Sequence, residues 1–374
     1  MTSRERVRAV LAHKQPDRVP LDLWGSASRV HTDLYKRMAG HFGYNELGPL
    51  VRKGTTTEYV DYRLSDLFHC DFRHIIAGKL ENFKSYTDDE GNTYDEWGIG
   101  KKLFDGFWGI TRHPLKNAEA IEEIMKHKWP DPCDPGRIAG IETQAKDWYE
   151  NTEFSLSTTT AVSGLFMELG QYLRGDSEFL MDLYINKEIA HCIIGKLTDI
   201  FEEMYAFYIT PVAKYIDWIE FTEDFGMQDR AFFSREVFRE FFFEPHKRLF
   251  TSLKRIAPQA KIFFHSCGSV RELIPEFIEM GIDVLNSLQP QAAGMDSAAL
   301  KRDFGKELVF HSGIDIQGAM RGSRQDVVDE VKKRIDAFGP GGGYILAPSN
   351  HFLGDVPIEN IITMYETAYE YGRY

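Results

Sequence analysis

Short β-prone runs alternate with helical patterns through the second half of the chain. Each run is rich in apolar and β-branched residues and is followed by a segment whose apolar residues recur three or four positions apart. Repeated strand-then-helix units imply a parallel sheet, because each helix carries the chain back to the start of the next strand. The runs cover residues 154–160, 218–226, 262–264, 283–289, 308–314 and 343–347.

A further run at residues 19–24 brings the expected strands to seven, and an eighth is expected in the N-terminal half. We therefore predict an α/β fold of the (β/α)8 TIM-barrel type. An open doubly wound sheet is the alternative, but no Gly-x-Gly-x-x-Gly loop follows a strand to support nucleotide binding. The glycine-rich stretch 339–343 precedes a strand, so we interpret it as a turn.

The N-terminal half is predicted to add helices and a hairpin to the barrel. Helical patterns cover residues 2–14 and 29–41. Two β-prone runs flank a polar turn within residues 82–104, which predicts a hairpin insertion. The proline-rich stretch 129–135 is interpreted as a connector between this region and the body of the barrel. We expect residues 1–374 to form a single barrel domain.

Composition limits the cellular setting and the partners. The 374 residues carry a net charge of −13 and no long Lys/Arg run, which argues against nucleic acid or an anionic membrane as a partner. The four cysteines, at positions 70, 133, 192 and 267, have no paired spacing, as is typical of a reducing compartment. Without a signal-peptide pattern or a membrane-spanning apolar run, we expect a cytoplasmic protein.

The sequence His265-Ser266-Cys267-Gly268 follows a buried run and precedes a helical pattern. Residues two apart in an extended segment point to the same side, so an imidazole and a thiolate can reach one point. These two groups are half of a zinc site, and the carboxyl end of a barrel strand is where such folds place their chemistry. The structural alternative is a buried histidine beside an inert core thiol.

Polar residues follow the other predicted strands as well, and a barrel would bring them to one face. Each alone has a structural explanation, such as capping a turn, but together they offer several metal ligands. A carboxylate from the preceding strand would lie about 4.8 Å from the His265 strand and could reach the same metal. The residues are Asp22, Trp24, Thr158, Thr160, Glu223, Asp224, His265, Cys267, Asn286, Gln289, His311, Asp315, Gln317, Ser349, Asn350 and His351.

Six segments, taken together, resemble the uroporphyrinogen decarboxylase superfamily, and the corrinoid-linked methyltransferase branch fits better than the true decarboxylases. The segments are residues 6–20, 264–270, 281–290, 310–317, 342–348 and 355–361. The resemblance implies a (β/α)8 barrel. The early arginine-rich loop with which the decarboxylases bind tetrapyrrole carboxylates is represented here by residues 23–29, which hold one arginine and a tryptophan.

In the methyltransferase branch, the resemblance implies zinc held by the His-x-Cys pair and by a late cysteine after an Ala-Pro pair. His265 and Cys267 match the first two ligands. The late cysteine is absent, because Ala347-Pro348 is followed by Ser349-Asn350-His351. We expect His351 as the third ligand and Glu223 as an oxygen ligand.

The first functional hypothesis is a zinc-dependent methyltransferase. It would move a methyl group between a small donor, such as an aromatic methyl ether (O-demethylation) or a methylamine, and a thiol or the corrinoid (cobalamin-type) cofactor of a separate protein. Asp224 and His311 are the candidate catalytic groups. A homodimer is compatible with this reading. The predicted substrate contacts are Asp22, Trp24, Asn286, Gln289, Asp315, Gln317 and Asn350.

Two alternatives remain open from the sequence. One is a metal-free decarboxylase (a carboxy-lyase) for a uroporphyrinogen or an aromatic acid, in which Asp22 or Asp224 protonates the ring carbon. The other is a non-catalytic member that binds a corrinoid protein or a small ligand.

Overall fold

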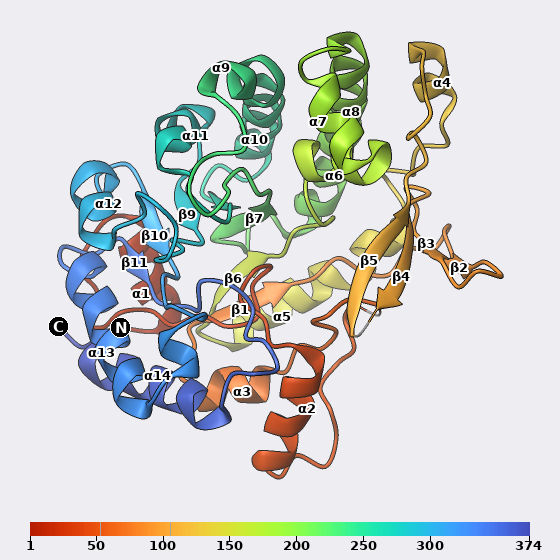
Figure 1. Ribbon diagram of the computed structural model, residues 1–374. Coiled ribbons are helices and arrows are strands. Elements are labelled where there is room, and N and C mark those ends of the chain that lie inside the picture. The colour runs from red at the N-terminus through yellow and green to blue at the C-terminus, as the bar shows by residue number, and fades with distance from the viewer. Residues whose placement is uncertain (53, 105) are drawn as a thin grey trace.

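The computed structural model describes residues 1–52, 54–104 and 106–374, and its centre is a curled parallel sheet of seven strands (Figure 1). The strand order is β1-β6-β7-β8-β9-β10-β11, and every neighbouring pair is parallel. The predicted parallel α/β fold is therefore confirmed. The strands are β1 Phe72–Ile75, β6 Ser155–Thr158, β7 Trp218–Thr222, β8 Lys261–His265, β9 Val284–Asn286, β10 Val309–His311 and β11 Tyr344–Ile345.

The segment predicted as a strand at residues 19–24 forms one isolated parallel bridge, between Leu21 and Leu346. Its backbone forms hydrogen bonds beside both edge strands of the sheet, β11 and β1. Leu346 N–H donates to the Pro20 carbonyl at 2.9 Å, and Asp71 N–H donates to the Leu21 carbonyl at 2.8 Å. A longer ladder does not form, because Pro20 has no N–H and the chain turns at Trp24, whose φ is 82°.

Helices surround the sheet on its outer side (Figure 1). Helix α8 spans Lys187–Ile209. The helical stretch 235–256 is interrupted by a π-helical segment, Arg239–Phe243. The other helices are α2 Thr32–His41, α3 Tyr62–Leu67, α4 Ile121–Lys126, α5 Ile141–Asn151, α6 Phe166–Arg174, α7 Asp176–Asp182, α9 Arg235–Phe238, α10 Glu244–Ile256, α11 Ile274–Met280, α12 Ser297–Phe304, α13 Arg324–Phe338 and α14 Ile358–Tyr371.

Helix α1, Ser3–Leu11, packs on the amino-terminal end of the sheet. Thr2 and Glu5 form a capping box that satisfies its first backbone N–H groups. Three of its apolar side chains join a buried cluster with residues near the starts of six strands. This packing closes one end of the sheet and leaves the carboxyl end for a site. The cluster is Val7, Val10, Leu11, Phe72, Trp218, Phe263, Val284, Val309 and Ile345.

The predicted hairpin insertion is present and is larger than expected. Strands β2 Tyr86–Thr87 and β3 Thr93–Tyr94 pair within residues 82–104, and β4 Gly100–Phe104 and β5 Phe107–Arg112 extend them to a four-stranded antiparallel sheet. Figure 1 shows this small sheet beside the ring of helices. Strand β1 precedes the connector at 129–135, so the parallel sheet receives strands from both sides of that connector.

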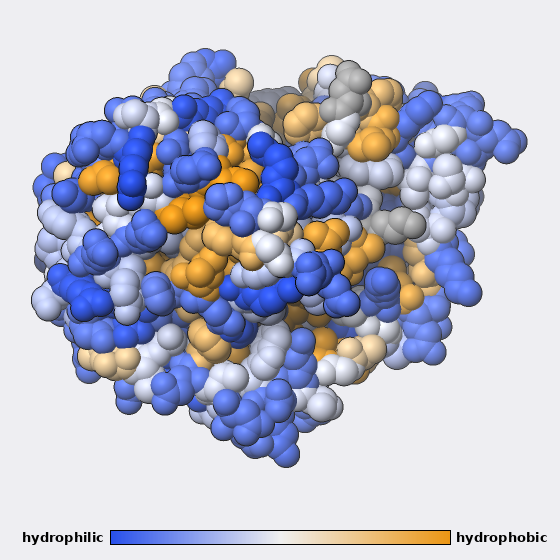
Figure 2. Space-filling view, turned by 90° about the horizontal axis from the view of Figure 1, so that it is seen from below, coloured by the Kyte–Doolittle hydropathy of each residue, from blue (hydrophilic) through white to orange (hydrophobic). Residues whose placement is uncertain are grey.

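Hydrophobic and hydrophilic residues are interspersed on the face drawn in Figure 2. Among the described residues, no helix has both the length and the apolar character needed to cross a bilayer.

Candidate metal-binding active site

A layer of polar side chains lies two residues beyond the apolar cluster along several strands. Since side chains alternate along a strand, residue i+2 points to the same side as residue i. Phe72 is thus followed by His74, and Val284 by Asn286. The whole layer is buried and consists of Asp22, His74, Ser157, Glu220, His265, Asn286 and His311.

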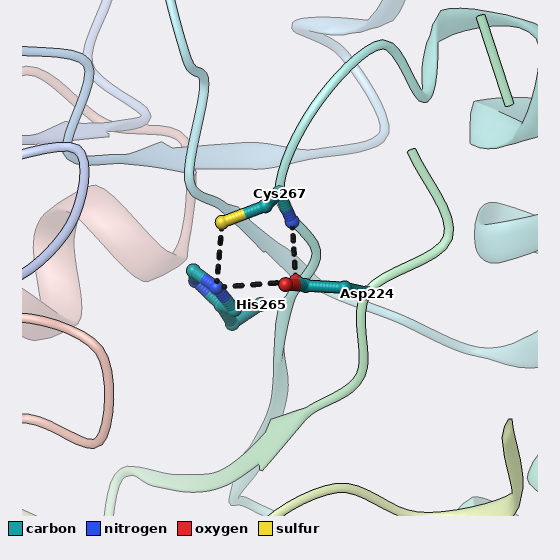
Figure 3. A group of neighbouring side chains, drawn as sticks. All are labelled: Asp224, His265 and Cys267. Carbon is teal, nitrogen blue, oxygen red and sulfur yellow. Dashed lines mark hydrogen bonds and ion pairs between the residues drawn. The ribbon is translucent and has the colours of Figure 1, made fainter. Parts of the chain in front are cut away.

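Asp224, His265 and Cys267 bring three ligand atoms together where β7 and β8 end (Figure 3). Nε2 of His265 lies 3.3 Å from Sγ of Cys267 and 3.5 Å from Oδ1 of Asp224, and the three ligand atoms all lie within 4.8 Å of one another. Within the described ranges, this is the one group of three His, Cys, Asp or Glu side chains whose ligand atoms are placed so that they could hold a metal ion. We refer to these three residues as the ligand group.

Two glycines explain why the loops that carry the ligand group approach so closely. A Cβ atom on Gly226 would lie 2.5 Å from the Cys267 carbonyl oxygen, and one on Gly268 would lie 2.4 Å from the Gly226 carbonyl oxygen. Gly268 also has a φ of 81°. Only glycine tolerates both the contact and the left-handed backbone. The loop after β7 therefore lies against the loop after β8, and Cys267 N–H donates to Oδ1 of Asp224 at 2.7 Å.

The electrostatics of the ligand group favour a positive charge at its centre. Burial alone would lower the pKa of His265, but Cys267 and the Asp224 carboxylate outweigh it and raise that pKa well above its usual value. Burial likewise opposes ionisation of Asp224, yet its hydrogen bonds with His265 and Cys267 lower its pKa. The group therefore attracts a cation.

The donor atoms suit zinc. Carboxylate oxygen, imidazole nitrogen and thiolate sulfur all bind this ion, and three protein ligands with one free position are typical of catalytic zinc sites. With bonds of about 2.0 to 2.3 Å, tetrahedral geometry separates ligand atoms by about 3.3 to 3.8 Å. The separations of 3.3 and 3.5 Å around Nε2 of His265 are close to this.

Glu223, predicted as the oxygen ligand, does not join the ligand group. Its carboxylate lies 2.6 Å from Nε2 of His246 and accepts a hydrogen bond from Met167 N–H. Glu223 and Asp224 are adjacent in extended backbone, so their side chains point in opposite directions and only Asp224 reaches His265.

His351, predicted as the late ligand, also lies outside the ligand group. Its Nδ1 accepts a hydrogen bond from Arg29 N–H at 3.0 Å. Burial, together with the positive charge of Arg29, lowers the pKa of His351 to about 3. Its neighbour Asn350 is the residue that contacts the site, since Nδ2 of Asn350 lies 3.2 Å from Sγ of Cys267.

A cavity of about 560 Å³ adjoins Cys267. Four of the predicted substrate contacts line it, and His351 does so too. The Asp315 carboxylate is already engaged there, because it accepts hydrogen bonds from Gln317 N–H, Gly318 N–H and the Gln291 amide. The lining residues include Gln289, Gln291, Asp315, Gln317, Asn350 and His351.

Ser349 lines the cavity too, whereas Asp22, Trp24, Asn286 and His311 do not. Trp24 is a core residue, buried with its indole N–H donating to the Asp61 carbonyl at 3.0 Å. Asp22, Asn286 and His311 belong to the buried polar layer. They sit one layer below Cys267, because Asn286 is in register with His265.

Sequence reasoning missed three ionisable residues near the site: His74, Glu168 and Glu220. His74 and Glu220 could have been found from their spacing, two residues after Phe72 and Trp218. Glu168 lies in the first turn of α6, and no local pattern marks it. Burial, with the Asp224 and Glu223 carboxylates nearby, raises the pKa of Glu168 to about 8.

Comparison with known proteins places the chain in a family. The profile of the uroporphyrinogen decarboxylase (URO-D) family matches residues 159–371. A solved methyltransferase from Methanosarcina mazei superposes with a TM-score of 0.66 at 14% identity, covering 99% of each chain. A GH10 xylanase with a bacterial Ig-like domain, from termite gut, gives a TM-score of 0.38 at 7% identity over 60% of this chain and 62% of its own, too low to support an argument. No curated protein sequence matches. Since the matched residues make up more than half of its length, this chain belongs to the uroporphyrinogen decarboxylase family.

Proposed function

We propose that the protein is a methyltransferase with a zinc ion held by Asp224, His265 and Cys267. It moves a methyl group between a small donor and either a thiol or the corrinoid of a separate protein. The observation that carries this proposal is the convergence of a carboxylate, an imidazole and a thiol beside a cavity of about 560 Å³. The shared fold with the Methanosarcina mazei methyltransferase agrees with it.

In this proposal four side chains near the ligand group or the cavity have defined tasks. Zinc bound there would supply a Lewis acid that polarises an ether oxygen or stabilises a thiolate. The Asn350 amide donates to the Cys267 sulfur and so offsets part of the thiolate charge. Glu168 keeps a proton near neutral pH and is the candidate donor to a leaving oxygen. Gln289 and Gln317 offer hydrogen bonds to the donor molecule.

We also infer that residues 19–24 act as the eighth strand of a closed barrel in one domain. Their backbone bonds to Leu346 on one side and to Asp71 on the other support this reading. Closure would place the ligand group at the carboxyl mouth, where barrel enzymes carry their chemistry.

Decarboxylation, the main alternative, is less well supported. It needs an accessible carboxyl group to protonate a ring carbon. Asp22 is fully buried, and both carboxylate oxygens are bound by imidazoles, from His74 at 2.8 Å and His311 at 2.9 Å. Burial opposes ionisation of Asp22, but these histidines hold its pKa below the usual value. Burial also opposes ionisation of Asp224, but its hydrogen bonds with His265 and Cys267 lower its pKa, so neither Asp22 nor Asp224 has a proton to give near neutral pH.

A spectroscopic assay with cob(I)alamin tests the proposal. The added reduced cobalt would attack the methyl carbon, a Co–CH3 bond would form as the O–CH3 or N–CH3 bond breaks, and the leaving oxygen or nitrogen would take the electron pair and a proton. We expect methylcobalamin to form from an aryl methyl ether or a methylamine, with loss of the reaction in Cys267→Ser and not in the remote variant Cys192→Ser. Carbon dioxide release from an aromatic acid or a porphyrinogen, equal in both variants, would contradict the proposal.

A further inference from the structure

A chain of hydrogen bonds between buried side chains runs from the ligand group into the middle of the sheet. Nδ1 of His265 bonds to Oδ1 of Asn286, and Nδ2 of Asn286 lies 2.8 Å from Nδ1 of His311. Nε2 of His311 lies 2.9 Å from Oδ2 of Asp22, and Oδ1 of Asp22 lies 2.8 Å from Nε2 of His74. All five side chains are buried, so water does not compete for these bonds.

The surroundings of the Asn286 amide fix its orientation. Its Nδ2 faces two atoms of His311: the ring Nδ1, and the backbone carbonyl oxygen at 3.4 Å. A carbonyl oxygen only accepts, so the amide nitrogen and not the amide oxygen must lie on this side. Oδ1 of Asn286 is thereby turned toward His265, where it accepts a hydrogen bond.

This orientation determines where the protons of both histidines lie. Nδ1 of His265 must carry a proton to donate to Asn286, so Nε2, which faces Cys267 and Asp224, is the nitrogen that would give up its proton and offer a lone pair when a metal ion binds. Nδ1 of His311 accepts from Asn286, so the proton of His311 is on Nε2 and points to Asp22. The carboxylate of Asp22 thus anchors the chain that ends at the ligand group.

We propose that Asn286 is the positioning residue that presents Nε2 of His265 to the metal, and that His311 and Asp22 hold Asn286 in the required orientation. The proposal rests on the proposed function insofar as it assumes a metal ion at the ligand group. It also reassigns Asn286 and His311, which the sequence predicted as a substrate contact and a catalytic group. Hydrogen-bond partners of metal-ligating histidines commonly change metal affinity by about 10- to 100-fold when replaced.

The test measures binding of zinc and of cobalt(II) to the whole protein, by competition with a chromophoric chelator and by visible absorption of the cobalt form. Asn286→Leu removes the acceptor, and we expect about 10- to 100-fold weaker zinc binding and altered cobalt ligand-field bands. Asn286→Asp keeps an acceptor for His265, and we expect affinity within about tenfold of the unmodified protein. Asn360→Leu is the control, because Asn360 is also buried but donates to the Met320 and Gly322 carbonyls.

The outcomes separate the two proposals. Equal zinc affinity and an unchanged cobalt spectrum in folded Asn286→Leu would overturn the positioning role alone, as would an Asn286→Asp variant as weak as Asn286→Leu. A protein that binds neither metal would overturn both this inference and the metal site in the proposed function. Normal metal binding without methyl transfer would overturn the proposed function alone. Circular dichroism and melting curves establish that each variant is folded.

Discussion

Glu223 and Asp224 are adjacent acidic residues whose side chains serve different parts of the molecule. Glu223 is fully buried against His246, whereas Asp224 is partly exposed beside His265. Removing one partner of a buried pair is costly, so Glu223→Ala should lower the free energy of unfolding by about 3 to 5 kcal/mol. Asp224→Ala should lower it by no more than about 1 kcal/mol while weakening zinc binding.

Urea denaturation and chelator competition on both variants check this assignment. If Glu223→Ala kept its stability and lost zinc while Asp224→Ala did the reverse, the two roles would be exchanged.

The side chain of His74 should make stability depend on pH in the alkaline range. Burial would lower its pKa, but the Asp22 and Glu220 carboxylates raise it to about 9 from an ordinary value of 6.5. Since the folded pKa is the higher one, the stabilisation is complete below pH 6.5 and is lost as the pH rises through about 9. The loss should reach about 3 kcal/mol.

Urea unfolding of the unmodified protein and of His74→Gln at several pH values between 6 and 10 measures this contribution. The difference in free energy of unfolding between the two proteins should shrink as the pH rises. A difference that stays constant over this range would show that His74 is not charged in the folded protein.

Among the helices, α1 contributes to stability and not to the site. Val10 is fully buried in the cluster at the amino-terminal end of the sheet. Val10→Ala should therefore lower the free energy of unfolding by about 2 kcal/mol, and loss of the cap in Thr2→Ala should cost about 1 kcal/mol. Zinc affinity should stay unchanged in both, because the ligand group lies at the other end of the strands. A Val10→Ala variant with weakened zinc binding would contradict this separation.

The elements differ in how far local sequence determines them. Helix α8 was predictable because its apolar residues keep helical spacing over its whole length. The π-helical turn before α10 was not predictable, because it depends on how Phe241, Phe242 and Phe243 pack in the core. The segment at 19–24 has a strand-like composition, but Pro20 and the turn at Trp24 limit it to one bridge.

The same distinction applies to the site. His265 and Cys267 were predictable as neighbours because they are two residues apart at a strand end. The burial of Asn286 and His311 below the ligand group was not predictable. It depends on the register between strands, which places Asn286 beside His265 and below Cys267. The choice between Glu223 and Asp224 depends on which side of the extended segment faces β8, and the sequence of this segment does not settle that.

For the molecule as a whole, the two ends of the parallel sheet have separate functions. Helix α1 and the apolar cluster stabilise one end, and the ligand group and its cavity occupy the other. The buried polar layer between them links the ligand group to Asp22 by hydrogen bonds. In the proposed function, the chemistry would depend on a metal ion held by the ligand group.

Metal analysis of the purified protein by mass spectrometry tests most directly whether the ligand group holds a metal ion. After equilibration with zinc and removal of the excess, we expect about one equivalent of zinc per chain. Asp224→Asn and Cys267→Ser should retain less than about a tenth of an equivalent, whereas Cys192→Ser should retain the full amount. Less than about a tenth of an equivalent in the unmodified protein, or an unchanged content in Cys267→Ser, would contradict the account.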